Sequence, residues 1–146
     1  DSFKSIKIED RVKIELEKIK SFMRTFSKKS DLFLLTGGVH SCALYDINGI
    51  LIFEEDIGRH NALDKILGKA LEDKVDLSDK MILTSGRISS EIILKAAKRG
   101  IPMVVSRSAP TSLAIDIAKE LNIALIGFVR GEKLNIYSGS IPSPKS

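Results

Sequence analysis

Apolar residues recur along the chain with two different periods, and the change of period separates predicted helices from predicted strands. Residues 9–29 place an apolar side chain at every third or fourth position, with Lys and Glu between them. This spacing predicts an amphipathic helix that packs on a core and turns its lysines toward solvent. The apolar positions are Val12, Leu16, Ile19, Phe22, Met23 and Phe26.

The segment after this helix predicts a β-hairpin. An apolar run at 32–35 is followed by Gly37-Gly38, which interrupts regular structure. Two short apolar runs, 40–45 and 50–53, then flank Asp46-Ile47-Asn48-Gly49. Because Asn-Gly between apolar runs is a strong hairpin signal, we predict a strand, a tight turn and a second strand.

From residue 58 onward the helical period returns and then alternates with short apolar runs. We predict a helix over 62–71 with a loop at 56–60 before it, and two further helices at 90–98 and 112–121. Strands are predicted at 81–84, 103–105, 124–129 and 134–137. Strands that alternate with helices of about ten residues indicate parallel βαβ units.

These elements predict an α/β fold: a three-layer αβα sandwich around a mixed, mostly parallel sheet. The 146 residues fit a single domain, with the N-terminal helix at 9–29, a core at 31–138 and a frayed tail at 139–146. A content of 43% hydrophobic and 29% charged residues is that of a globular chain and excludes a disordered one.

Composition also narrows the compartment and the partners. No apolar run approaches the roughly 18 residues of a membrane span, and the N-terminal residues lack a signal peptide, so we expect a cytoplasmic protein without membrane contact. The single Cys42 and two histidines are too few for a structural zinc site, and no metal is predicted. With 5% aromatic residues and no Trp, nucleic-acid binding is not expected either.

Three predicted strands end in similar polar sequences. These ends are Ser85-Gly86-Arg87, Ser106-Arg107-Ser108 and Arg130-Gly131. Ligands of open α/β sheets bind beyond the carboxyl ends of the parallel strands, and a guanidinium suits phosphate or carboxylate oxygens. Thr111-Ser112, at the start of a helix, either adds backbone N–H groups to the same site or simply caps the helix. We predict that a ligand with phosphate groups binds at this edge.

Two histidines are further candidates. His60 lies beyond the second strand, where it would hold a ligand oxygen, act as a general acid or base with Asp56, or only cap the next helix. His40 and Cys42 are two residues apart on a strand, so they share a face. A Cys–His pair can act as nucleophile and base, but a small packing cysteine is the favoured interpretation on a buried strand.

Five ordered blocks of the sequence resemble one family. The blocks are TGGVHSCALYD (36–46), EDIGRHNALDKILG (55–68), TSGRISSEIILKAAKRGIP (84–102), SAPTSLAIDIAKEL (108–121) and GFVRGEKLNIYS (127–138). Together they resemble the C-terminal domain of the FdhD/NarQ family of formate dehydrogenase accessory proteins. The resemblance covers about residues 30–138.

The resemblance implies a sulfur carrier of cytidine-deaminase-like fold and dimeric assembly. It would pass sulfur from a cysteine desulfurase to the molybdenum cofactor, a bis(molybdopterin guanine dinucleotide), before insertion into formate dehydrogenase. GDP would mimic this ligand. The cofactor-binding stretch of the family maps onto Phe128, Val129, Arg130, Gly131, Glu132 and Lys133. Arg87 and Arg107 are then expected as further phosphate contacts.

The sequence departs from the family pattern at the sulfur-carrying cysteines. These lie in a CxxC-type loop N-terminal to the domain, and this sequence contains no CxxC. We therefore expect the persulfide cysteine upstream of Asp1, together with the N-terminal domain, and do not assign that role to Cys42. Two alternatives stay open: a docking module that binds a molybdoenzyme near Tyr137 without chemistry, and a nucleotide hydrolase that uses His60 and Asp56.

Overall fold

The computed structural model describes residue 12, residues 14–34 and residues 39–139. The helices are α2 (Leu16–Leu34), α3 (Arg59–Glu72), α4 (Ser90–Lys98) and α5 (Ser112–Glu120). The strands are β1 (His40–Asp46), β2 (Gly49–Asp56), β3 (Met81–Thr84), β4 (Met103–Ser106), β5 (Ala124–Arg130) and β6 (Lys133–Ser138).

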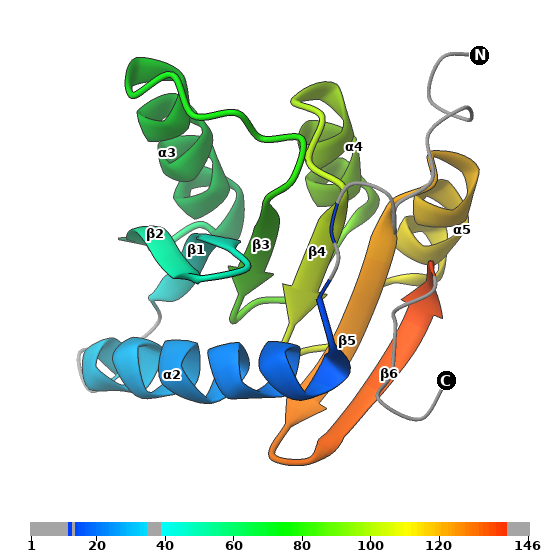
Figure 1. Ribbon diagram of the computed structural model, residues 1–146, viewed down its shortest axis with the longest axis horizontal. Helices are drawn as coiled ribbons and strands as arrows, with labels where there is room; N and C mark the ends of the chain where they lie inside the picture. The colour runs from blue at the N-terminus through cyan, green and yellow to red at the C-terminus, as the bar shows by residue number, and fades with distance from the viewer. Residues whose placement is uncertain (1–11, 13, 35–38, 140–146) are drawn as a thin grey trace.

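The strands form one mixed sheet in the order β2-β1-β3-β4-β5-β6 (Figure 1). Strands β3, β4 and β5 are parallel, as the alternation of strands and helices predicts. Strand β1 is antiparallel to β2 and β3, and β6 is antiparallel to β5. Strands β2, β3, β4 and β5 therefore point the same way, and their carboxyl ends meet at one edge of the sheet.

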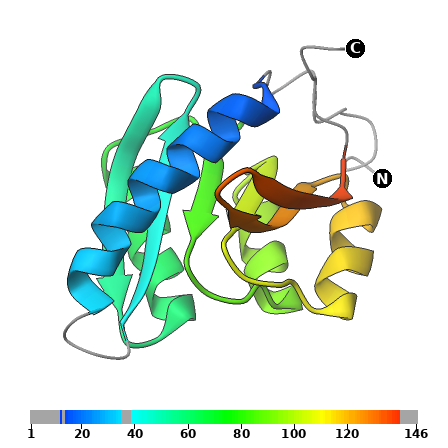
Figure 2. The same cartoon turned by 90° about the horizontal axis from the view of Figure 1, so that it is seen from below.

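Helices cover both faces of the sheet, which confirms the three-layer arrangement. Figure 1 and Figure 2 show α2 crossing one face and α3, α4 and α5 on the other. The buried apolar residues divide accordingly into two clusters. Alternation along β1 illustrates the division: Cys42 and Leu44 belong to the cluster with α3, α4 and α5, whereas Ala43 and Tyr45 belong to the cluster with α2.

Helix α2 is displaced along the sequence from its predicted range. It begins at Leu16 and continues to Leu34. Val12 and Ile14 are only 2% and 3% exposed, and their two-residue spacing is that of extended chain rather than helix. At the other end Ser30 is buried and donates a hydrogen bond from Oγ to the Oγ of Ser41 at 2.9 Å, so the helix can carry a polar residue against β1. Residues 9–11 lie outside the described part of the chain.

The remaining boundaries are close to those predicted. The hairpin turn consists of Ile47 and Asn48, and the Oδ1 of Asp46 accepts hydrogen bonds from the backbone N of Asn48 and Gly49 at 2.7 and 3.1 Å. Helix α3 starts at Arg59, so His60 lies in its first turn instead of in a loop. Apart from Gly139, the predicted frayed tail lies outside the described residues. Within those residues no helix is both long and apolar enough to span a membrane.

Close packing around Gly127, in the middle of β5, leads to a stability prediction. A Cβ on Gly127 would lie 2.9 Å from Tyr137 Cε2, 3.0 Å from Pro110 Cδ and 3.1 Å from the backbone O of Ser108. Gly127→Ala should therefore lower the free energy of unfolding by about 1–3 kcal/mol in urea denaturation, as overpacking does. The matched control is Gly68→Ala in α3, where a Cβ meets nothing within 4 Å and the helix gains about 0.5–1 kcal/mol. Equal effects of the two substitutions would contradict this account of Gly127.

Candidate anion-binding site

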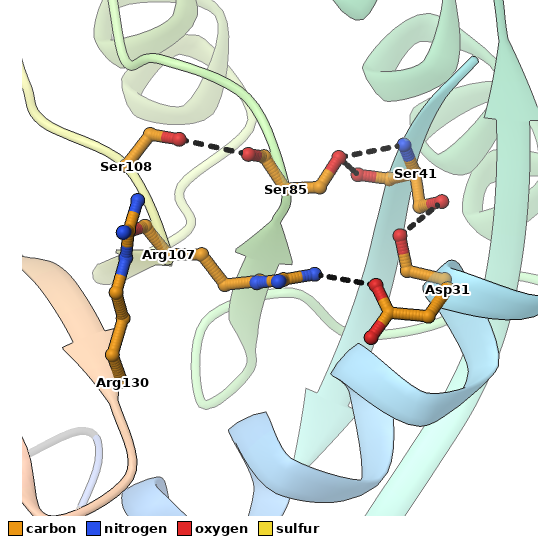
Figure 3. A network of polar contacts seen from close by, with 7 residues as sticks. Asp31, Ser41, Ser85, Arg107, Ser108 and Arg130 are labelled. Carbon is orange, nitrogen blue, oxygen red and sulfur yellow. Dashed lines mark hydrogen bonds and ion pairs between the residues drawn. The ribbon is translucent and has the colours of Figure 1, made fainter. Parts of the chain in front are cut away.

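Hydroxyl groups cross-link the carboxyl ends of β3 and β4 to the start of β1 (Figure 3). The Oγ of Ser108 donates to the backbone O of Ser85 at 3.0 Å, and the Oγ of Ser85 accepts from the backbone N of Ser41 at 3.0 Å. In addition, the buried Ser106 donates from Oγ to the backbone O of Gly86 at 2.7 Å. These bonds fix the two loops relative to each other, and so they also fix the backbone from which Arg107 projects.

The arginines at the ends of β4 and β5 lie together at this edge. The Nε of Arg130 donates to the backbone O of Arg107 at 3.2 Å (Figure 3). The Nη1 of Arg107 forms an ion pair with Asp31 Oδ1 at 3.0 Å, and Asp31 belongs to α2. Two cationic side chains from neighbouring strands are thus held beside the same helix.

A cavity of about 420 Å³ lies between α2 and these strand ends. Ligand sites commonly measure about 300–1,000 Å³, so the cavity has room for a small molecule. Among the described residues that line the cavity, five are cationic: Lys20, Arg24 and Lys28 from α2, and Arg107 and Arg130 from the sheet edge. The other described residues of the lining are Met23, Ser27, Val129 and Gly131. Such a concentration of positive charge around a cavity attracts an anionic ligand.

Acidic side chains at the rim neutralise part of this charge. Glu132, in the turn between β5 and β6, places its Oε2 3.3 Å from Arg24 Nη1 and its Oε1 3.7 Å from Lys20 Nζ. Lys20 also pairs with Glu17 at 3.0 Å. Together with the pair between Asp31 and Arg107, these contacts connect α2 to both strand ends that border the cavity.

The structure brings together only part of the predicted site. Arg107, Val129, Arg130 and Gly131 line the cavity, but Arg87, Thr111, Ser112 and His60 are not among its described lining residues. The reason is the layering of the fold. Helices α3 and α5, whose first turns carry His60 and Ser112, cover the opposite face of the sheet from α2. The predicted site residues therefore do not all line this one cavity.

Several of these residues have local structural roles. The Oγ1 of Thr111 accepts from the backbone N of Ala114 at 3.1 Å and caps α5, while Ser112 and Arg87 are exposed. Phe128 adopts a left-handed backbone conformation, with φ of 54°, where the pairing of β5 with β6 is irregular. Gly131 has φ of 61° in the following turn, a conformation that glycine adopts without strain. Lys133 begins β6 opposite Arg130.

The geometry around His60 does not favour the hydrolase alternative. Asp56, its expected carboxylate partner, accepts hydrogen bonds from the backbone N of Gly58 at 3.0 Å and Asn61 Nδ2 at 3.3 Å, and pairs with Lys65 at 3.0 Å. The bond from Gly58, followed by that from Lys65, lowers the pKa of Asp56 to about 2. A carboxylate with such a low pKa is a poor proton acceptor. The Nδ1 of His60 is buried and has no hydrogen-bond partner within the described residues.

Comparison with known proteins shows what this chain is related to. The sequence profile of the FdhD/NarQ family matches residues 1–141. A sulfur carrier protein FdhD from Bacillus pumilus is 51% identical over 129 residues, which cover 88% of this chain and 49% of that protein. A second sulfur carrier protein FdhD, from Listeria innocua, is 50% identical over 138 residues, which cover 94% of this chain and 53% of that protein. The chain belongs to the FdhD/NarQ family. It spans about half the length of these curated relatives.

Solved structures agree with this membership and with the predicted fold. A crystal structure described as a formate dehydrogenase accessory protein from Desulfotalea psychrophila has a TM-score of 0.81 and 35% identity, over 88% of this chain and 56% of that one. A diaminohydroxyphosphoribosylaminopyrimidine deaminase/reductase from Thermotoga maritima has a TM-score of 0.58 at 15% identity, over 80% and 38% of the two chains. The second likeness shows the fold alone, and it supports the deaminase-like αβα description.

Within this FdhD/NarQ domain, Cys42 is a packing residue. It is 2% exposed and belongs to the apolar cluster under α3, α4 and α5. Burial raises the pKa of its thiol to about 12. Because the thiolate is the nucleophilic form of cysteine, this thiol is unsuited to carrying sulfur near neutral pH. His40 lies on the same face of β1, and a Cβ on Gly86 would be 3.2 Å from its Nδ1.

The contribution of α2 is what the sequence interpretation missed. Its lysines were expected to form a solvated face, yet Lys20 and Lys28 line the cavity with Arg24 between them. A signal was present, because these cations recur at every fourth position, which places them on one side of a helix. Without the packing of α2 across the sheet, that stripe is indistinguishable from an ordinary exposed helix face.

The buried environment of Cys42 predicts low reactivity. In the native protein at pH 8, a thiol-specific chromogenic disulfide should react with Cys42 at least about a hundredfold more slowly than in urea, because its pKa of about 12 leaves almost no thiolate. Absorbance kinetics with and without denaturant measure the ratio. Cys42→Ala should fold and bind GDP as the wild type does. Rapid labelling of the native thiol would show that Cys42 is accessible for chemistry.

Proposed function

We propose that this chain is the cofactor-binding part of a sulfur carrier that serves formate dehydrogenase. The observation that carries the proposal is the cationic cavity at the sheet edge, in a chain that belongs to the FdhD/NarQ family. The proposed ligand is bis(molybdopterin guanine dinucleotide), whose phosphate groups would enter this cavity. Sulfur from a cysteine desulfurase would reach it through a cysteine outside this chain, since the one cysteine here is buried.

The residues at the cavity fit the phosphate groups of such a ligand. Arg130 uses its Nε to hold the backbone of Arg107, which directs its terminal nitrogens to bind phosphate oxygens. Gly131 lines the cavity without a side chain, so a phosphate can approach the backbone there. Met23 and Val129, 2% and 1% exposed, provide an apolar floor. When bound, the cofactor would supply the metal centre that receives sulfur.

The other predicted contacts belong to the proposal only if the ligand extends along the edge beyond the cavity. Arg87, His60 and Thr111-Ser112 would then meet its outer parts, as would the exposed Phe128 and Lys133. The proposed protein partners are formate dehydrogenase, a cysteine desulfurase and a second copy of the chain, in the cytoplasm. Formate dehydrogenase is the partner that the name of the Desulfotalea psychrophila relative supports.

Ligand binding should stabilise the fold. At 100 times its dissociation constant, GDP should add about 2.7 kcal/mol to the stability of the chain, and the melting temperature should rise accordingly. Sulfate should compete with GDP, because it would occupy the same cationic cavity. Differential scanning fluorimetry with GDP, with the intact cofactor and with added sulfate measures both effects. If neither GDP nor the cofactor raises the melting temperature, the cavity is not a nucleotide site.

Arg130 should dominate the sheet side of the site. Arg130→Ala should weaken GDP binding about tenfold, because a hydrogen bond to a charged group contributes roughly 1.5–3 kcal/mol. Arg130→Lys should retain only part of the GDP affinity that Arg130→Ala loses, since an ammonium lacks the planar fork of a guanidinium. The control is Lys29→Ala, because Lys29 lies on α2 with its Nζ 5.1 Å from the centre of the Phe53 ring and does not line the cavity. Titration calorimetry compares the variants, and equal affinities for Arg130→Ala and Lys29→Ala would move the nucleotide elsewhere.

A further inference from the structure

We propose that α2 is the second ligand-binding wall of this site, with Lys28 contacting a second phosphate group, and that Glu132 is an internal competitor for the same wall. This inference rests on the proposed nucleotide binding and makes it more specific. It assigns the diphosphate group of that ligand to two contacts, one on each wall of the cavity. It also gives Glu132, expected to be a ligand contact, the opposite role.

The arrangement of charges favours two phosphate groups. Arg107 and Arg130 form the sheet side of the cavity, while Lys20, Arg24 and Lys28 form the side of α2. With a rise of 1.5 Å per residue, the three helix cations extend over roughly 12 Å of the helix axis. A single phosphate group is shorter than this row of cations, which favours two linked phosphate groups. Two linked phosphate groups would contact Arg130 on one side and Lys28 on the other.

Lys28 is the helix cation best placed to receive the ligand. Lys20 is already paired with Glu17 and Glu132, and Arg24 with Glu132. Lys28 lines the cavity, and none of the ion pairs among the described residues contains it. Its ammonium group is exposed and is therefore available to an anion that enters the cavity.

Glu132 occupies the position that a phosphate would otherwise take beside Lys20 and Arg24. Its carboxylate lies 3.7 Å from Lys20 Nζ and 3.3 Å from Arg24 Nη1. In the sequence, Glu132 directly follows Gly131, which lines the cavity. The Glu132 side chain is 74% exposed, and such exposed ion pairs are weak. A diphosphate can therefore displace the Glu132 carboxylate. Until the carboxylate moves away, its negative charge lowers the affinity of the site for the diphosphate.

Titration calorimetry with GDP and GMP tests the role of Lys28. Lys28→Gln should weaken GDP binding about threefold or more and GMP binding clearly less, because only GDP has the second phosphate group. The matched control is Lys29→Gln, which removes the same charge from the neighbouring residue, whose ammonium lies over Phe53. An equal loss for GDP and GMP, or an equal loss in both variants, would overturn the assignment of the second phosphate contact.

The role of Glu132 is tested by removing its charge. Glu132→Gln should tighten GDP binding about two- to fivefold, the range expected for removing one exposed charge contact. Glu132→Asp, which keeps the charge, should stay near the wild type, and Glu72→Gln, which removes a charge at the end of α3, should have no effect. If Glu132→Gln only lowers the melting temperature and leaves GDP affinity unchanged, Glu132 is a structural tether and the inference fails.

The two proposals fail in distinguishable ways. If the wild-type chain binds neither GDP nor GMP, the proposed function fails and the inference with it. If the wild type binds GDP and Arg130→Ala weakens it, but Lys28→Gln and Glu132→Gln change nothing, only the role assigned to α2 and Glu132 is overturned.

Discussion

The hydrogen bonds among the serines at the carboxyl ends of β3 and β4 are the interactions on which the site depends. Neighbouring strands are about 4.8 Å apart, so Arg107, directly after β4, and Arg130, the last residue of β5, carry like charges at short range. Ser106, Ser108 and Ser85 fix the loops, and the backbone O of Arg107 then fixes Arg130. Because these groups are ordered before a ligand arrives, binding loses less conformational entropy than it would at a flexible loop.

Helix α2 links the stability of the fold to the site. Ile19 and Phe26 are fully buried against the sheet, and Lys20, Arg24 and Lys28 lie on the adjacent side of the same helix. A period of 3.6 residues is what allows one helix to present both an apolar and a cationic side. An anion held between α2 and the strand ends would therefore also hold α2 on the sheet.

The acidic residues around the cavity make this arrangement tolerable without a ligand. Five cations at one edge repel one another and disfavour the compact state. Asp31 and Glu132 offset part of this repulsion through their ion pairs with Arg107, Arg24 and Lys20. The opposite cluster is apolar and contains the single cysteine, and burial there raises the pKa of its thiol to about 12.

The sequence by itself determined the fold class, most element positions and the family. Local periodicity is sufficient for helices such as α4 and α5, because each buries one continuous apolar stripe, and the serine–arginine strand ends already pointed to an anion. Only the tertiary structure decided which of those residues meet. The choice of sheet face for each helix depends on long-range packing, and it separates Thr111 and His60 from Arg107 and Arg130. The same packing makes the cations of α2, which the sequence presents as a solvated stripe, one wall of the cavity. It does so because it brings Lys28 and Arg130, about a hundred residues apart in the sequence, to the lining of one cavity.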